Sequence, residues 1–249
     1  MRLSRVPDGN IPELFDGLDD GALALVVNAA RHCTRLREEV FCRQGESAAN
    51  LYLLTKGLVK VGGTTDTGKE VLLNWMRPGE AFGLGALLSA PTDYVWTVYS
   101  AAPSEALQWD AATINRFAHS SPSVYANALS ITLQWARQLQ DRFEELSTKM
   151  VEQRLAHLVL FLADRFPIPQ PAQVPVSHEE LAQMIGTTLF GVSRIINRWQ
   201  RLGYVQKSRN RLLVLDREGL SRTTSESADS HAPAMANASQ HTQSRLAFY

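Results

Sequence analysis

The chain has 249 residues, enough for one large domain or two modest ones, and 45% of them are hydrophobic, as expected of a protein with a real core. Its 25 Lys and Arg residues balance its 25 Asp and Glu residues, so any attraction to nucleic acid or acidic membranes must come from a local charge asymmetry. The two cysteines, Cys33 and Cys42, fit neither a disulfide framework nor a zinc site, and the absence of a signal peptide or membrane-length apolar run predicts a cytoplasmic protein with no membrane contact.

The first part of the chain divides into a helical and a β-rich region. From about residue 12 to residue 32, apolar residues recur at helical spacing, which predicts a helix. From about residue 33 to residue 110, short runs of β-forming residues alternate with glycine turns. Short strands at near-regular spacing predict a small antiparallel barrel or roll, and we expect this domain to cover residues 1–112.

One segment of the β-rich region imitates a nucleotide-binding loop. The run GTTDTGK, residues 63–69, matches the first seven positions of a P-loop, but the next residue is Glu70 instead of the Ser or Thr that would hold magnesium. A P-loop opens a helix, whereas this run lies between two β-like segments, so we interpret it as a hairpin turn. The six histidines are scattered and no nucleophile signature is present, so we expect no catalytic residue, no metal site and no enzyme activity.

A long helix is predicted next, over about residues 122–147 of a segment that spans residues 113–147. Its apolar residues follow one another at alternating steps of three and four, and only Thr132 interrupts the series. An ordinary amphipathic helix packed inside one chain is one interpretation. A narrow seam sustained over three heptads favours the other, which is pairing with the same helix of a second copy. The predicted seam comprises Leu129, Ala136, Leu139, Phe143 and Leu146, and Met150 continues the series.

Residues 148–219 read as a second folded unit. The helix VEQRLAHLVLFLADRF ends at a proline cluster, since proline cannot continue a helix. Ser177 and Glu180 form a capping-box pattern that starts another helix, Gly186 ends that helix, and a second helix runs from Thr187 or Thr188 to about residue 202. A basic hairpin, YVQKSRNRLLVLD, follows. Two helices joined by a short glycine turn, with a hairpin after them, predict a winged helix-turn-helix, and residues 220–249 are expected to form a disordered tail.

The charge of this unit is local and positive. Between residues 177 and 215 there are six Lys and Arg residues and two Glu residues, a charge of +4 in a chain whose total is zero. The two glutamates open the first helix, while every basic residue lies on the second helix or the hairpin. This separation is typical of a surface that binds DNA phosphates, and the alternative is a solvated basic helix with no partner.

The second helix has two distinct faces when its residues are placed about 100° apart. Val192, Ile196 and Trp199 fall on the core arc with Ile195, whereas Phe190 falls on the opposite, basic arc. An exposed apolar side chain at the start of a recognition helix can contact a thymine methyl group, and arginine can bind guanine. Two alternatives stay open: Leu189 packs inward, and Phe190 packs against a neighbouring loop or the wing. The predicted DNA-contacting residues are Thr187, Thr188, Leu189, Phe190, Ser193, Arg194, Asn197, Arg198, Lys207 and Arg209.

The order of these elements resembles the CRP/FNR family of bacterial transcription regulators over roughly residues 12–216. The resemblance is carried by QGESAANLYLLTKGLVKV and RPGEAFGLGALL in the roll and by LAQMIGTTLFGVSRIINRWQRLGYV in the C-terminal unit. It implies an α+β fold with an N-terminal antiparallel β-roll (a double-stranded β-helix), a long dimerisation helix and a C-terminal winged helix-turn-helix. It further implies a homodimer that binds a palindromic DNA site, senses a small signal in the roll and contacts RNA polymerase.

The roll departs from the cyclic-AMP-binding members of that family. Those members carry Gly-Glu-Leu, whose Glu holds the ribose, and later Arg-Ser-Ala, whose Arg neutralises the phosphate; the matching segments here read GLG at residues 83–85 and YVW at residues 94–96. Because a buried anion without a cation is costly, we expect no cyclic AMP in the usual mode. Two cysteines cannot supply the four thiolates of an iron–sulfur cluster. The expected effector pocket, with Tyr99 as a further candidate, suits a hydrophobic ligand or none and comprises Phe82, Gly83, Leu84, Leu87, Tyr94 and Trp96.

Some alternatives stay open at this stage. A haem is one, held through Cys33, Cys42, His32 or a methionine, although no spacing singles out a ligand. The recognition helix also departs from the family, because Leu189 and Phe190 replace an Arg-Glu pair, which predicts a different half-site. A second functional class is a nucleotide- or haem-regulated sensor subunit that acts through a partner protein. It needs the missing nucleotide anchors and leaves the winged unit unexplained.

Overall fold

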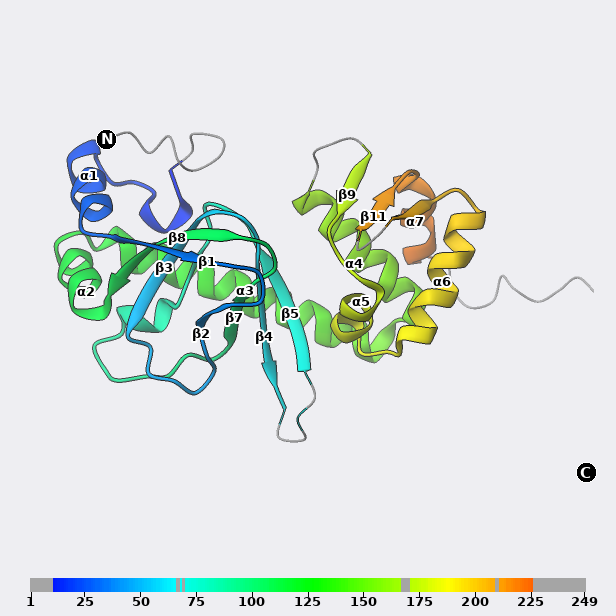
Figure 1. The fold of residues 1–249 in the computed structure, drawn as a ribbon, viewed down its shortest axis with the longest axis horizontal. Helices are drawn as coiled ribbons and strands as arrows, with labels where there is room; N and C mark the ends of the chain where they lie inside the picture. Colours follow the sequence, from blue (N-terminus) through cyan, green and yellow to red (C-terminus); the bar gives the residue numbers. More distant parts are fainter. Residues whose placement is uncertain (1–10, 66–67, 69, 167–170, 209–210, 226–249) are drawn as a thin grey trace, which may run out of the picture.

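A computed structural model describes residues 11–65, 68, 70–166, 171–208 and 211–225 of the chain. Arg209 and residues 226–249 of the expected tail therefore lie outside the described residues. Figure 1 shows the β-roll on one side, a smaller helical unit with its own short strands on the other, and the long helix α3 reaching from the roll to that unit. No helix in the described part of the chain combines the length and the hydropathy needed to cross a membrane.

Two four-stranded antiparallel sheets form the roll, in the orders β1-β8-β3-β6 and β2-β7-β4-β5. Alternation along β3 directs Tyr52 and Leu54 between the two sheets, and Leu51 and Leu53 toward the helices that cover the first sheet. This confirms the predicted roll. The strands are β1 Arg31–Arg35, β2 Val40–Cys42, β3 Asn50–Lys56, β4 Val59–Thr64, β5 Glu70–Met76, β6 Ala81–Phe82, β7 Thr97–Ser100 and β8 Ser104–Asp110.

The hairpin interpretation of the GTTDTGK run is also confirmed. Strands β4 and β5 pair antiparallel on either side of it, with Thr64 opposite Glu70 and Val59 opposite Met76. The run therefore joins two strands of one sheet and opens no helix, which removes the structural context that a phosphate-binding P-loop requires.

The predicted helix over residues 12–32 is wrong as a single element. The segment contains a 3₁₀ turn η1 (Glu13–Phe15), then α1 (Asp20–Asn28), and it ends in strand β1. Gly17 has a φ of 77°, a left-handed conformation that interrupts a helix, and the Asp19 carboxylate starts α1 by accepting the Ala22 N–H at 2.8 Å. A cap in the middle of a periodic pattern thus divides it.

The helical segment after the roll is likewise divided. Helix α2 (Ala111–Ser120) is capped by Asp110, and α3 (Ser123–Thr148) begins after Pro122, so the expected boundary at residue 113 falls inside α2. The short 3₁₀ turn η2 (Leu84–Leu87) packs near α2. Helix α3 matches the predicted long helix, and its buried residues Val124, Ala128 and Ile131 pack against the roll.

The C-terminal unit is a winged helix-turn-helix, as predicted. Ser177 and Glu180 make the expected capping box, and Gly186 ends the first helix with a φ of 65°. The proline-rich connection adds an unpredicted strand, β9, which pairs with β11 and completes a three-stranded wing. The final helix extends six residues into the stretch assigned to the tail. The elements are α4 Val151–Arg165, β9 Ala172–Val174, α5 His178–Ile185, α6 Leu189–Arg201, β10 Val205–Ser208, β11 Arg211–Val214 and α7 Arg217–Ser225.

Candidate DNA-binding surface and effector cavity

Helix α6 presents the two faces that its sequence predicted. Thr188 caps the helix, since its hydroxyl accepts the Gly191 N–H at 3.1 Å. Phe190 is 77% exposed and Leu189 is 51% exposed. Both alternatives, inward packing of Leu189 and packing of Phe190 on a loop or the wing, are therefore wrong. The buried face comprises Val192, Ile195, Ile196 and Trp199.

The other predicted DNA contacts fall into two groups. Thr188, Arg194, Asn197 and Lys207 are exposed, on α6, at its start or on β10 of the wing. Thr187 and Ser193 are only half-exposed. These side chains, together with the two exposed apolar residues at the start of α6, form the reading face. Arg209 lies outside the described residues.

Arg198 differs from the rest of the predicted set. Its guanidinium pairs with the Glu152 carboxylate of α4, and the other oxygen of that carboxylate accepts the Trp199 indole N–H at 2.8 Å. One acidic side chain thus holds two consecutive residues of α6. In this arrangement Arg198 is engaged within the protein, and a DNA phosphate would have to compete with Glu152 for it. Glu152 is a functional neighbour that no sequence signal indicates, because nothing local links it to α6.

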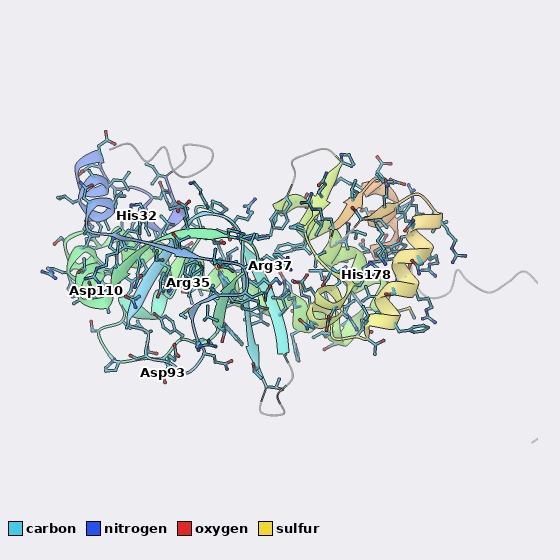
Figure 2. All side chains as sticks on the ribbon, viewed as in Figure 1. His32, Arg35, Arg37, Asp93, Asp110 and His178 are labelled. Atoms are coloured by element: carbon cyan, nitrogen blue, oxygen red, sulfur yellow. The ribbon has the colours of Figure 1, made fainter. Side chains whose placement is uncertain are left out.

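His178, at the first turn of α5, also contacts the recognition helix. Its Nδ1 atom lies 3.0 Å from the Ser193 hydroxyl, and Figure 2 places the residue in the winged unit beside α5 and α6. Burial lowers the pKa of the imidazole, and the charge of Lys207 lowers this pKa further. The folded protein therefore favours the neutral ring.

This lowered pKa predicts a pH-dependent stability. Below the ordinary histidine pKa of 6.5 the unfolded chain binds a proton that folded His178 resists. The free energy of unfolding should therefore fall as pH drops below about 6.5 and level off once the pH is below the folded pKa. Denaturant unfolding across this range should show a smaller fall in the free energy of unfolding for His178→Gln than for the parent. His32→Gln, a control at an exposed position, should show the same fall as the parent. Equal slopes in all three proteins would contradict the assignment.

A large cavity of about 870 Å³ lies between the roll and α3. All six residues of the predicted effector pocket line it, so the fold brings Phe82, Gly83, Leu84 and Leu87 together with Tyr94 and Trp96. The further candidate Tyr99 is not part of the cavity wall. Its ring lies under Lys60, whose ammonium is 5.5 Å from the ring centroid. Distant elements supply a part of the wall that no sequence signal indicates, namely Val61, Met76, Tyr125 and Trp135.

The cavity wall is almost free of charge. Among its lining residues in the described part of the chain there is no Lys or Arg, and the one carboxylate, Asp93, is exposed at the edge of the roll (Figure 2). The Tyr94 hydroxyl is already used, because it accepts the Asn50 N–H and donates to the Asn50 carbonyl, both at 2.9 Å. The one basic side chain on the described wall is the imidazole of His119, whose Nδ1 lies 2.7 Å from the Asn115 carbonyl oxygen. The site can therefore bury apolar surface but offers no described lysine or arginine to an anionic ligand.

The cysteines offer little metal chemistry. Cys42 lines the cavity, but burial raises the pKa of its thiol to about 12, which disfavours the thiolate that binds metals. Burial also raises the pKa of Cys33, which with His32 is absent from the cavity wall. Within the described residues no group of three or more His, Cys, Asp or Glu side chains is arranged to hold a metal ion.

The seam residues of α3 lie on a face that this chain leaves open. Phe143 is 70% exposed, Leu129 is 61% exposed and Leu146 is 50% exposed. Leu139 and Ala136 are exposed as well, and with Leu129 they also line the cavity. The helix therefore uses one face against its own roll and presents a neighbouring apolar stripe to solvent, beside the cavity.

A β-roll with an apolar cavity, joined by a long helix to a basic winged helix-turn-helix, defines a DNA-binding regulator with a separate N-terminal domain. The Cyclic nucleotide-binding domain model matches residues 35–121, and the Crp-like helix-turn-helix domain model matches residues 153–223. The chain belongs to the CRP/FNR family and is a transcription regulator with a helix-turn-helix DNA-binding domain. Regulators of this family bind DNA and function as dimers, and they are not enzymes.

Individual relatives agree with this assignment. The chain is 24% identical over 213 residues to the CRP-like cAMP-activated global transcriptional regulator of Mycobacterium tuberculosis, covering 84% of this chain and 95% of the relative. It is 29% identical over 190 residues to the transcriptional regulator LdrP of Thermus thermophilus, covering 75% and 93%. The structure of FixK2 from Bradyrhizobium japonicum shares the fold, with a TM-score of 0.70, 18% identity and coverage of 80% and 99%. None supports the alternative of a subunit acting through a partner protein.

Proposed function

We propose that two copies of the chain pair along the exposed stripe of α3 and read a palindromic DNA site with their two α6 helices. The observation that carries this proposal is the reading face itself, on which the exposed Phe190 stands one helical turn before Arg194 and beside further polar and basic groups. An isologous dimer repeats this face by a two-fold axis, so its DNA site repeats an inverted half-site. The protein acts in the cytoplasm, with RNA polymerase as a further partner.

Each group on the reading face has a distinct role in this proposal. Arg194 donates two hydrogen bonds to a guanine, and Phe190 packs on a thymine methyl group. The hydroxyls of Thr187, Thr188 and Ser193 contact phosphates with the backbone N–H groups at the start of α6. Leu189 adds apolar contact, and Asn197, Lys207 and Arg209 add polar contacts. Arg198 contributes only after it leaves Glu152.

The role of Arg194 can be tested on a DNA site selected from a random library. Arg194→Ala should lose about 1–3 kcal/mol of discrimination at one base pair in each half-site, because the bidentate contact is gone. Competition gel shifts with every base at each position measure this loss. Arg116→Ala, an exposed arginine of α2 on the roll, is the matched control and should select the parent's site. A parental binding motif for Arg194→Ala would remove the residue from base recognition.

We further propose that the cavity takes an uncharged apolar effector. The support is a cavity of about 870 Å³ whose wall is made mainly of aromatic and aliphatic side chains and has no described lysine or arginine. The cyclic-AMP-activated regulator of Mycobacterium tuberculosis is named for a ligand that carries a phosphate charge, and this wall has no described lysine or arginine to neutralise that charge.

Thermal unfolding separates the two kinds of ligand. Decanol, as an apolar probe, should raise the Tm, since a ligand at a hundred times its Kd adds about 2.7 kcal/mol of stability, whereas cyclic AMP should leave the Tm unchanged. Leu84→Asp, which places a charge on the wall, should abolish the response to decanol. A Tm increase with cyclic AMP, or the same decanol response in Leu84→Asp, would contradict the proposed ligand class.

A further inference from the structure

The paired strands β4 and β5 separate two environments. Val61 and Met76 point into the roll, where they join its inner core and line the effector cavity. Lys60 and Trp75, which are opposite one another in the strand pair, point the other way, and Trp75 belongs to the core of the winged unit. Because successive side chains of a strand alternate between faces, one ribbon forms both a wall of the cavity and a docking surface for the DNA-reading unit.

An extra residue in β5 shapes that docking surface. The register shifts between Val61 and Gly62, so Leu73 has no direct partner on β4, and Leu72 comes to the same face as Trp75. The Leu73 carbonyl accepts a hydrogen bond from Arg142 of α3. The bulge therefore places two apolar side chains against the winged unit, where β5 packs on α5.

Lys60 is the charged group at the centre of this surface. Lys60 is only 7% exposed, and its ammonium lies 5.2 Å from the ring centroid of Trp75 and 5.5 Å from that of Tyr99. The ammonium pairs with the carboxylate of Glu180 in α5. The carboxylate of Glu38 is farther away, with one oxygen 4.0 Å from the Lys60 nitrogen. A buried ammonium so placed depends on its carboxylate partner, because neither charge is well hydrated.

Glu180 links this ion pair to the helix-turn-helix, because the same carboxylate also caps helix α5. Its other oxygen accepts the Ser177 N–H at 2.7 Å, which closes the capping box of α5. A single carboxylate thus joins the start of the helix-turn-helix to the sensor domain. A second tie lies at the end of α4, where Arg165 donates to both oxygens of Glu80 at 2.6 Å and to the Trp75 carbonyl at 2.9 Å.

We propose that Lys60 is a positioning residue for DNA recognition. Its pair with Glu180 holds the helix-turn-helix on the outer face of the ribbon whose inner face lines the effector cavity, and so sets the orientation of α6 relative to the dimer stripe on α3. A displacement of the ribbon at Val61 or Met76 also displaces Lys60 and with it α5. This inference rests on the proposed function, and it adds the route by which the cavity acts on the DNA-binding surface.

The test compares Lys60→Met, Glu180→Gln and the double variant with the parent. Methionine keeps an apolar stem over the rings, and glutamine keeps an acceptor for the Ser177 N–H, so each change removes the charge with little change of shape. The matched control is Lys56→Met, which breaks an exposed pair with Glu105 whose N–O distance is 2.9 Å and whose side chains are 59% and 40% exposed. Affinity is measured for the selected DNA site and for a random duplex, with hydrogen exchange of the free proteins.

The singles and the double variant should each lose about tenfold in affinity for the selected site, within the range of coupling between sites in proteins, and the losses should not add. Random DNA should bind as before, because buried Lys60 cannot reach a phosphate. Amide protection should fall in β5 and α5 alone. If a single variant unfolds, the affinity of the double variant tests the proposal in its place, because the double variant leaves neither partner of the pair with an unpaired charge.

The positioning role of Lys60 is overturned if the double variant binds the selected site as tightly as the parent and Lys56→Met do, or more tightly. An equal loss for selected and random DNA, which indicates general damage, overturns it as well. If the parent itself binds no duplex, the proposed function fails as well, and the two failures are therefore distinguishable.

Discussion

Replacing Phe143 with glutamate is expected to convert the protein into a monomer that no longer retains a palindromic DNA site. Phe143 is 70% exposed in the single chain and lies between Leu139 and Leu146 in the α3 stripe. In a pair of α3 helices the two substituted side chains would bring like charges into an apolar seam, which is costly. Loss of the second half-site removes the effective concentration that joins two binding events, an advantage of about 10²–10⁴.

Sedimentation velocity and gel shifts measure the two consequences together. Ser130→Glu is the matched control, because Ser130 is exposed on the same helix but lies about 100° from Leu129 and away from the stripe. It should remain a dimer and bind the selected site like the parent. A Phe143→Glu protein that sediments as a dimer would show that the copies associate through some other surface.

Replacing Trp199 with alanine should cost about 3–5 kcal/mol in the free energy of unfolding of the winged unit, the range found for large aromatic side chains in cores. Trp199 is fully buried between α6 and α4, and its indole N–H is bound to Glu152. Without it α6 loses both its largest core contact and the hydrogen bond that fixes it to α4. DNA affinity should fall with stability, because the reading face is no longer held in one orientation.

Two further variants separate packing from hydrogen bonding. Trp199→Phe retains most of the ring volume and loses the N–H donor, so it should cost about 1–3 kcal/mol, since the loss of one partner leaves part of Glu152 unsatisfied. Gln200→Ala, at the next and exposed position of α6, should change the unfolding free energy by no more than about 0.5 kcal/mol. Chemical denaturation followed by circular dichroism measures all three. A Trp199→Ala protein as stable as Gln200→Ala would contradict the packing described here.

The elements of the DNA-reading unit could be predicted because their signals are local. A capping box joins residues three apart, as Ser177 and Glu180 show, and the two faces of α6 follow from the helical period alone. The same period identified the α3 stripe. Where a local signal opposes the period, the prediction is wrong: Gly17 and the Asp19 cap divide a pattern that the period alone predicts to be one helix.

Arg198 shows the limit of this approach at the candidate site. Its position on the helical wheel and its charge both favoured a DNA contact, yet its guanidinium is paired with Glu152, a residue of another helix. The effector cavity shows the same limit. Its predicted residues come from two short segments of the roll, residues 82–87 and 94–96. Val61 and Met76 reach the wall only through strand register, and Trp135 reaches it only through the packing of α3.

The amino-acid sequence by itself determined the class of this protein: a β-roll, a long helix with an apolar seam and a basic winged helix-turn-helix whose recognition helix carries an outward phenylalanine. Periodicity, caps and charge act between near neighbours, so they can be read in one dimension. Only the tertiary structure decided that Lys60 of the roll pairs with Glu180 of α5 and that the two faces of one ribbon serve different domains. Those contacts depend on packing between segments far apart in the chain, and the placement of Leu72 beside Trp75 depends on a register shift at Leu73, neither of which a local pattern encodes.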